Sequence, residues 1–186
     1  MHEKKIFIIR HGEAEGNDYD CPLKPEGRKK VEDMVVSLLQ KEDMKESQII
    51  SSRYLRAIQT AHIFSQHLNL DFCTDSRLNE INVGNIQGNF KEEIRKRFEC
   101  VDLKFEDEGG ESIHQVMERT HQVMRDIMNE NNKKNYILVT HRITTILLLH
   151  YFDKHFGFDQ AWVLTSPDAY LITMSDENFK VNHIHP

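Results

Sequence analysis

Arg10 and His11 follow directly on a short apolar run, residues 6–9, and their side chains suit the chemistry of an anion. The guanidinium group is permanently charged, and its planar fork matches the oxygens of a phosphate. The imidazole can act as a nucleophile or carry a proton near neutral pH. An arginine–histidine pair after a strand is more often part of an ordinary loop. A phosphate site therefore predicts two further features: more positive charge, and an acid for the leaving group.

Arg56 is the candidate for additional positive charge. It opens a helical pattern that follows a second short strand, residues 47–52. The N-terminal end of a helix carries partial positive charge, so an arginine gains nothing there from the helix dipole. The position of Arg56 therefore favours a bound anion, whereas we interpret Arg53 as a solvated side chain.

Glu80 is the candidate acid. It lies in a glycine-containing loop, residues 77–88, between Leu78 and Ile81. Partial burial there would disfavour the charged form and let the carboxyl group hold a proton near neutral pH. A surface glutamate is the alternative interpretation, and Glu13 is the competing candidate for the acid.

His141 is a second histidine at the end of an apolar run. Residues 136–140 are typical of a buried strand, and His141 and Arg142 follow before a helical pattern. In open α/β sheets, ligands bind beyond the carboxyl ends of the strands. His11 and His141 would therefore converge if their strands are neighbours.

Strands and helices alternate along the chain, which predicts the α/β class. A Pro25-Glu26 start and a serine cap at Ser112 mark two of the helices, and Asn89 with Glu92 at the capping-box position marks a short one. Strands are expected at 6–9, 47–52, 69–73, 136–140, 169–174 and 179–184, and helices at 25–40, from 55, at 90–98, 112–129 and 143–151. The first of the two closing strands is expected to be antiparallel.

The composition fits one soluble globular domain, residues 1–186. The 39% hydrophobic and 29% charged content excludes a disordered chain, and the formal net charge of −6 gives no general attraction to nucleic acid or to an anionic membrane. No apolar run approaches the length of a membrane span or signal peptide, so we expect a cytoplasmic protein. Three scattered cysteines predict neither a disulfide framework nor a structural zinc site. No feature specifies an oligomeric state.

The motifs together resemble the histidine phosphatase superfamily, the phosphoglycerate mutase-like proteins. They occur in the order of that family and span nearly the whole chain. The matching segments are Arg10-His11-Gly12-Glu13 with Asn17, Ser51-Ser52 with Arg56-Ala57 and Gln59-Thr60-Ala61, Glu80 before Gly84 and Gly88, Gly110-Glu111-Ser112, and Val139-Thr140-His141. The resemblance implies a three-layer α/β/α sandwich with a mostly parallel central sheet.

The resemblance also implies a mechanism for a small phosphorylated substrate, without metal or other cofactor. His11 would attack phosphorus and become a phosphohistidine. Glu80 would protonate the departing alcohol and then deprotonate the water that hydrolyses the intermediate. The phosphoryl group would be held by Arg10, Asn17, Arg56 and His141.

Three positions depart from the family pattern. Arg142 stands where glycine is common, and we expect it to contact the substrate and to favour one with a second anionic group. Lys24 replaces a usual threonine, which exchanges a hydroxyl group for a charge. Ser166-Pro167-Asp168-Ala169 replaces a segment that frequently contains asparagine or glycine.

The stretch between Glu80 and Glu111 is short, which resembles the compact phosphatases more than the mutases. A phosphomonoesterase of small metabolites is therefore the leading hypothesis. The alternatives are a cofactor-dependent phosphoglycerate mutase, a protein phosphohistidine phosphatase and a non-catalytic phosphate-binding module. Phe156, Phe158 and Trp162 are interpreted either as a pocket wall or as simple packing. His183 and His185 are interpreted either as a metal site or as a surface tail.

Overall fold

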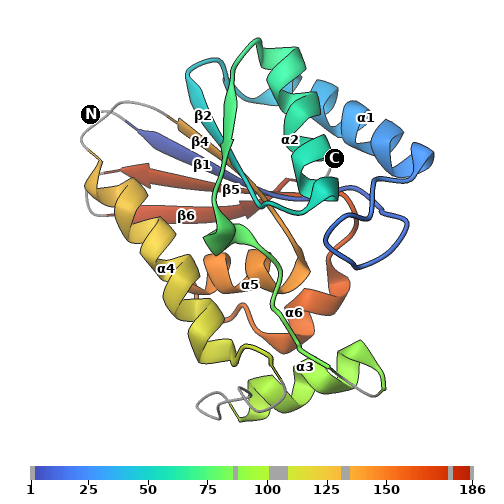
Figure 1. Ribbon diagram of the computed structural model, residues 1–186. Helices are drawn as coiled ribbons and strands as arrows, with labels where there is room; N and C mark the ends of the chain where they lie inside the picture. Colours follow the sequence, from blue (N-terminus) through green and yellow to red (C-terminus); the bar gives the residue numbers. More distant parts are fainter. Residues whose placement is uncertain (1–2, 86–87, 101–108, 131–134, 176–177, 185–186) are drawn as a thin grey trace.

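A six-stranded sheet forms the centre of the protein, which we describe from a computed structural model (Figure 1). The structure describes residues 3–85, 88–100, 109–130, 135–175 and 178–184. The strand order is β3-β2-β4-β1-β5-β6. The strands are β1 (Lys4–Arg10), β2 (Ser47–Ser51), β3 (Phe72–Thr74), β4 (Asn135–Thr140), β5 (Asp168–Ser175) and β6 (Asn178–His183). The first four are parallel to one another, and β5 is antiparallel to both β1 and β6, which confirms the expected mostly parallel sheet.

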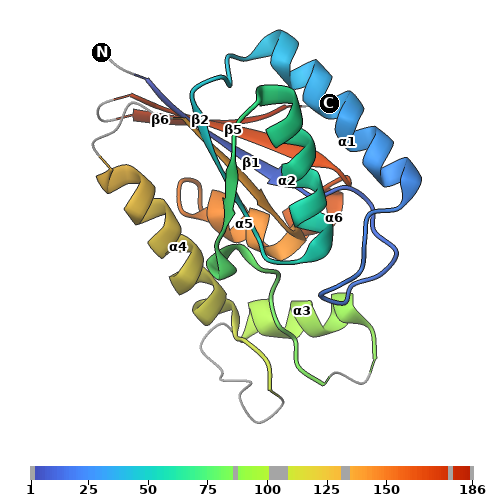
Figure 2. The same ribbon diagram turned by 45° about the horizontal axis from the view of Figure 1, so that its top comes forward.

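Helices cover both faces of the sheet, so the predicted three-layer α/β/α architecture is confirmed (Figure 1). On one face lie α1 (Pro25–Lys41) and α2 (Leu55–Leu68). On the other lie α4 (Ile113–Asn129), α5 (Arg142–His150) and α6 (Phe158–Val163). The short helix α3 (Phe90–Glu99) lies apart from the sheet in both views (Figure 2).

The apolar run in β1 is continuous because this strand is buried on both faces. Ile6 and Ile8 pack in the core with α4 and α5, whereas Phe7 and Ile9 pack in the core with α1 and α2. Successive side chains of a strand point to opposite faces, so a central parallel strand needs apolar residues at every position. This pattern predicted the strand correctly.

The register of β1 and β4 brings the two histidines together. Arg10 pairs with Thr140, so His11 and His141 leave neighbouring strands at the same carboxyl edge. The His11 N–H donates to the Thr140 carbonyl at 3.0 Å, which continues the pairing by one residue. The condition for His11 and His141 to converge, that their strands are neighbours, is therefore confirmed.

The sequence predicted the elements better than their ends. The third strand begins at Phe72 rather than at residue 69, because Asn69 ends α2 in the left-handed conformation with φ 53°. Asn89 caps α3 by accepting from the Lys91 N–H, without the capping box that Glu92 was expected to form. The helix α6 was not expected from the sequence. Ser112 caps α4, as predicted. Among the described residues, no helix combines the length and the apolar character needed to cross a membrane.

The loop after His11 packs directly on the first turn of α1. A Cβ atom on Gly12 would lie 2.7 Å from the Gly27 carbonyl oxygen, and one on Gly27 would lie 2.2 Å from the Glu13 carbonyl oxygen. The Lys24 N–H also donates to that Glu13 carbonyl at 2.9 Å. Two glycines thus allow the backbones to approach closely and fix the segment that carries His11.

We predict that Gly27→Ala lowers the free energy of unfolding by about 1–3 kcal/mol, because the new methyl group forces the Glu13 backbone away. Gly157→Ala is the matched control: a Cβ there meets only a side-chain oxygen at 3.8 Å, and the expected cost is below about 1 kcal/mol. Urea titration of both variants checks this. Equal stability of Gly27→Ala and wild type would show that the loop is not held in this way.

Candidate active site

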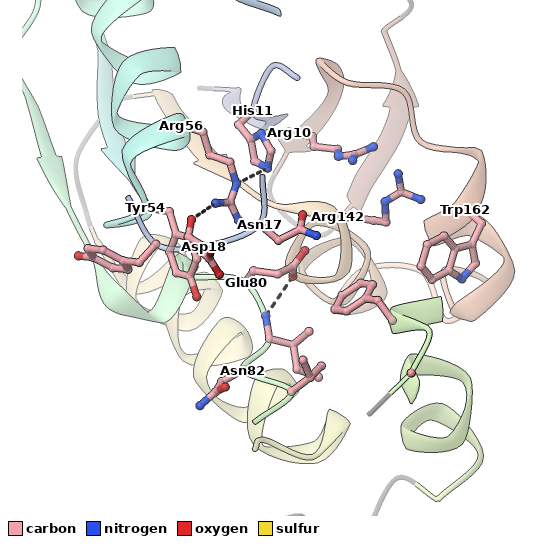
Figure 3. A pocket seen from close by; sticks show the side chains of 15 residues that line it. Arg10, His11, Asn17, Asp18, Tyr54, Arg56, Glu80, Asn82, Arg142 and Trp162 are labelled. Carbon is pink, nitrogen blue, oxygen red and sulfur yellow. Dashed lines mark hydrogen bonds between the residues drawn. The ribbon is translucent and has the colours of Figure 1, made fainter. Parts of the chain in front are cut away.

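A cavity of about 660 Å³ opens at the carboxyl edge of the sheet (Figure 3). Six of the seven site residues predicted from the sequence line it: Arg10, His11, Asn17, Arg56, Glu80 and Arg142. The seventh, His141, is buried behind His11, with 4.9 Å between the ring centroids. The structure therefore brings all seven predicted residues together.

The His11 ring has a fixed tautomer. Its Nδ1 lies 2.6 Å from the Gly12 carbonyl oxygen, which can only accept, so Nδ1 carries the proton. Its Nε2 accepts a hydrogen bond from Arg56 Nε at 3.1 Å (Figure 3). Burial, with a further contribution from the charges of Arg56, Arg10 and Arg142, lowers the pKa of His11 to about 3, although the Gly12 hydrogen bond opposes this. At neutral pH the ring is uncharged, with a lone pair on Nε2.

Arg10 and Arg56 are oriented by backbone carbonyls, which accept without neutralising charge. Arg10 Nη1 donates to Leu164 at 2.9 Å and to Thr165 at 2.7 Å. Arg56 Nη1 donates to Asp18 at 2.7 Å. A guanidinium group has five N–H donors, so each arginine keeps donors for a ligand. Arg10 Nε is buried without a hydrogen-bond partner among the described residues. Burial lowers the pKa of Arg10 to about 10.

His141 is oriented by a short relay of side chains that the sequence did not reveal. Its Nε2 lies 2.7 Å from Ser52 Oγ, which donates to Asn79 Oδ1 at 3.0 Å. Because that amide oxygen is the acceptor, the Ser52 proton points toward Asn79 and His141 Nε2 donates. His141 Nδ1 is buried without a partner among the described residues, and burial holds the pKa of His141 well below its usual value. Ser52 lay in a matched motif, but no local pattern indicated its partner.

Glu80 is partly buried, as expected, but polar backbone groups rather than apolar side chains contact its carboxylate. Its carboxylate lies at the N-terminus of α5, where Oε2 accepts from the Ile143 N–H and Oε1 from the Thr144 N–H, both at 3.2 Å. The Ile81 N–H donates to Oε1 at 3.1 Å (Figure 3). Three backbone N–H groups therefore fix the position of the Glu80 carboxylate at the start of α5. The nearby side chains of Leu78 and Ile81 are buried, whereas Glu80 is partly buried and lines the cavity.

The family follows from a comparison of the sequence. Residues 6–184 match the profile of the "Histidine phosphatase superfamily (branch 1)". The chain belongs to this superfamily. It is 29% identical over 153 residues to the "Probable phosphoglycerate mutase GpmB" of Escherichia fergusonii, with 75% of this chain and 70% of the relative covered.

Solved structures share the fold. YhfR of Bacillus stearothermophilus is 22% identical, with a TM-score of 0.76 and coverage of 97% of this chain and 96% of that one. A phosphoserine phosphatase variant from Entamoeba histolytica, solved with phosphoserine, is 19% identical, with a TM-score of 0.77 and the same two coverages.

One departure from the superfamily pattern lies outside the cavity. Lys24 Nζ pairs with Glu13 Oε1 at 2.6 Å, and neither residue lines the cavity. The charge of Lys24 is therefore directed at Glu13 rather than at the site. This pairing also disfavours Glu13 as the acid.

The second departure is the segment around Asp168, which holds in place the Thr165 carbonyl that accepts from Arg10. Buried Asp168 accepts from the Thr165 N–H at 3.0 Å and lies 2.6 Å from His183 Nε2. The Ser166 hydroxyl donates to the His11 carbonyl at 2.8 Å. His183 is therefore a hydrogen-bonded strand residue rather than part of a tail. His185 lies outside the described residues, among which no three His, Cys, Asp or Glu side chains are grouped to hold a metal ion.

Arg142, the third departure, lies over an aromatic ring at the cavity. Its guanidinium carbon is 4.7 Å from the centroid of Trp162, and both residues line the cavity. Phe156 and Phe158 do not line it and contact other aromatic rings. Of the three aromatic residues with two interpretations, Trp162 is a wall residue and the other two pack.

The buried neutral His11 predicts an acid-sensitive stability. Its folded pKa lies below the unfolded value of about 6.5, so the unfolded chain binds the extra proton and stability falls as pH falls from about 6.5 toward 3. Between pH 7.5 and 5, wild type should lose about 2 kcal/mol more unfolding free energy than His11→Asn. Urea titrations at the two pH values measure this difference.

His67→Asn, at an exposed position, is the control and should follow wild type. The same pH slope in wild type and His11→Asn would contradict a buried, uncharged His11.

Proposed function

We propose that this protein hydrolyses phosphomonoesters of small metabolites through a phosphohistidine on His11. One observation carries the proposal: an uncharged imidazole presents Nε2 beside two arginines and a carboxylate in one cavity. The membership of the chain in the histidine phosphatase superfamily supports it.

In the first step, His11 Nε2 attacks phosphorus in line with the departing alcohol. The N–P bond forms as the P–O ester bond breaks, and the Glu80 carboxyl group gives its proton to the alcohol oxygen. The Gly12 carbonyl, which accepts from Nδ1, stabilises the positive charge that develops on the ring. Free donors of Arg10 and Arg56 stabilise the phosphoryl oxygens.

Glu80 must carry a proton for this step. We infer that the proton arrives with the substrate. A monoanionic phosphomonoester carries one acidic proton, and it can pass this proton from a phosphoryl oxygen to Glu80.

In the second step, Glu80 acts as the base. It takes a proton from water as the water oxygen attacks phosphorus and the N–P bond breaks. Inorganic phosphate takes this proton from Glu80 and leaves as the monoanion, and His11 is again neutral. Asn17, which lines the cavity, supplies a further contact to the phosphoryl group. His141 does not line the cavity, and its ring packs edge-on against His11.

A phosphoglycerate mutase is the second candidate, and the identity to the E. fergusonii protein, described as a probable phosphoglycerate mutase, favours it. Hydrolysis remains the first choice because the described residues between Glu80 and Glu111 form a single short helix, α3. Interconversion of 3- and 2-phosphoglycerate with a bisphosphate primer, compared with phosphate release from the same substrate, separates the two. Isomerisation faster than hydrolysis would replace our proposal by the mutase.

We predict turnover of 4-nitrophenyl phosphate in EDTA, and a loss of at least about 10³-fold in kcat for His11→Ala. Glu80→Gln should reduce hydrolysis of alkyl phosphates by about 10²–10⁴-fold. It should reduce kcat/KM for 4-nitrophenyl phosphate far less, because this ratio reports formation of the phosphohistidine, in which nitrophenolate leaves without a proton. Steady-state assays of phosphate release measure both effects.

Glu13→Gln is the matched control, since Glu13 pairs with Lys24 away from the cavity, and it should stay within about 3-fold of wild type. Full activity of His11→Ala would exclude the phosphohistidine mechanism. An inert wild type that still binds phosphate would favour the non-catalytic binding module.

A further inference from the structure

Arg142 differs from the other two arginines of the cavity in having no acceptor. It is half-buried at the first position of α5, and it forms no hydrogen bond or ion pair with any residue that the structure describes. Arg10 and Arg56 each donate to backbone carbonyls. The donors of Arg142 are therefore available to a ligand in the cavity that it lines.

The position of Arg142 is electrostatically unfavourable in the absence of an anion. The N-terminal end of a helix disfavours a cation. Burial lowers the pKa of Arg142, and the charge of Arg142 contributes to the lowered pKa of Arg10, so the two guanidinium groups repel one another. Glu80 offers partial compensation but forms no ion pair with Arg142. A bound anion would relieve this repulsion.

Trp162 holds the guanidinium group of Arg142 in place. The 4.7 Å stacking distance is that of a cation–π contact, which restricts the flexible side chain and leaves its planar edge for a ligand. Figure 3 shows Arg142 between Arg10 and Trp162, on the opposite side of Arg10 from Arg56. Lys91 Nζ lies 5.2 Å from the same indole ring and adds positive charge beyond it.

The cavity thus has a second cationic region next to the one around His11. A phosphoryl group bound by Arg10 and Arg56 would place its leaving group in the remaining space, which is lined by Arg142 and Trp162, by residues 81–83, and by Tyr19 and Tyr54. Among the described residues of that lining, Arg142 alone combines a full positive charge with unused hydrogen-bond donors.

We propose that Arg142, stacked on Trp162, binds a second anionic group of the substrate, a carboxylate or a further phosphate. The preferred substrates are therefore phosphomonoesters whose alcohol carries an acid group. This proposal rests on the proposed function for the phosphoryl site, and it adds the chemical class of the leaving group.

Matched substrate pairs test the proposal. Phosphoglycolate is compared with ethyl phosphate, and propane-1,3-diol bisphosphate with propyl phosphate. The measured quantity is the ratio of kcat/KM within each pair, because this ratio cancels effects on the transferred phosphoryl group. In Arg142→Gln the ratio should fall by about 10–100-fold for the pair whose anion Arg142 binds. Arg142→Lys keeps the charge but loses the fork, and should show a smaller fall.

Arg95→Gln is the control. Arg95 also lies over an aromatic ring, 5.2 Å from the centroid of Phe158, but it is exposed and does not line the cavity. Its ratios should equal those of wild type. A fall confined to the phosphoglycolate pair identifies a carboxylate as the second group, and a fall confined to the bisphosphate pair identifies a phosphate.

Unchanged ratios in Arg142→Gln would overturn the proposal. If both members of each pair lose activity equally, Arg142 acts on the transferred phosphoryl group instead. If neither loses activity, the contact with Trp162 is only structural.

A binding measurement tests the role of Arg142 independently of the proposed phosphatase function. If wild type hydrolyses no phosphate ester, including 4-nitrophenyl phosphate, the proposed function fails. Calorimetry with phosphoglycolate and ethyl phosphate in the His11→Ala protein still measures the second region. Phosphoglycolate should bind at least about 10-fold more tightly, and Arg142→Gln should remove this advantage. Equal affinity for the two compounds would overturn the proposal.

Discussion

The site depends on one constraint: an imidazole stays uncharged in the middle of three arginines. Burial and the surrounding positive charges remove any tendency of His11 to bind a proton at neutral pH, and the Gly12 carbonyl fixes the remaining proton on Nδ1. The lone pair of Nε2 is then unprotonated; it accepts from Arg56 Nε, and attack on phosphorus requires release of this hydrogen bond. The nearby charge attracts a substrate with an anionic phosphoryl group. A chain with a net charge of −6 concentrates this positive field in one cavity.

Backbone groups compensate for the unfavourable free energy of gathering these charges in one site. The pairing of β1 with β4 sets the two histidines side by side, and carbonyls of Leu164, Thr165 and Asp18 accept from the arginines without cancelling their charge. For the negatively charged partner, the first turn of α5 supplies N–H donors to the Glu80 carboxylate. Main-chain contacts thus hold both the arginines and the carboxylate at the cavity that can receive a phosphoryl group.

The sequence predicted what is local and periodic. Continuous apolar runs indicated the central strands, and the ends of those runs indicated where His11 and His141 would lie. The sequence could not predict contacts made by loops distant in the chain, such as the relay from His141 through Ser52 to Asn79. It gave Glu80 apolar surroundings from its neighbours in sequence, whereas the carboxylate binds to a helix more than sixty residues away. The stacking of Arg142 on Trp162 likewise required the unexpected helix α6.

The most direct test of the account is the identity of the phosphorylated atom. Wild type and Glu80→Gln would be mixed with substrate in EDTA, quenched in alkali, and examined by phosphorus NMR and by peptide mapping. Because Nδ1 of His11 is bound to the Gly12 carbonyl, we predict phosphate on Nε2 of His11, stable in alkali and lost in acid. Slower attack of water in Glu80→Gln should increase its amount. Turnover without a phosphorylated His11, or phosphate on Nδ1, would contradict the account.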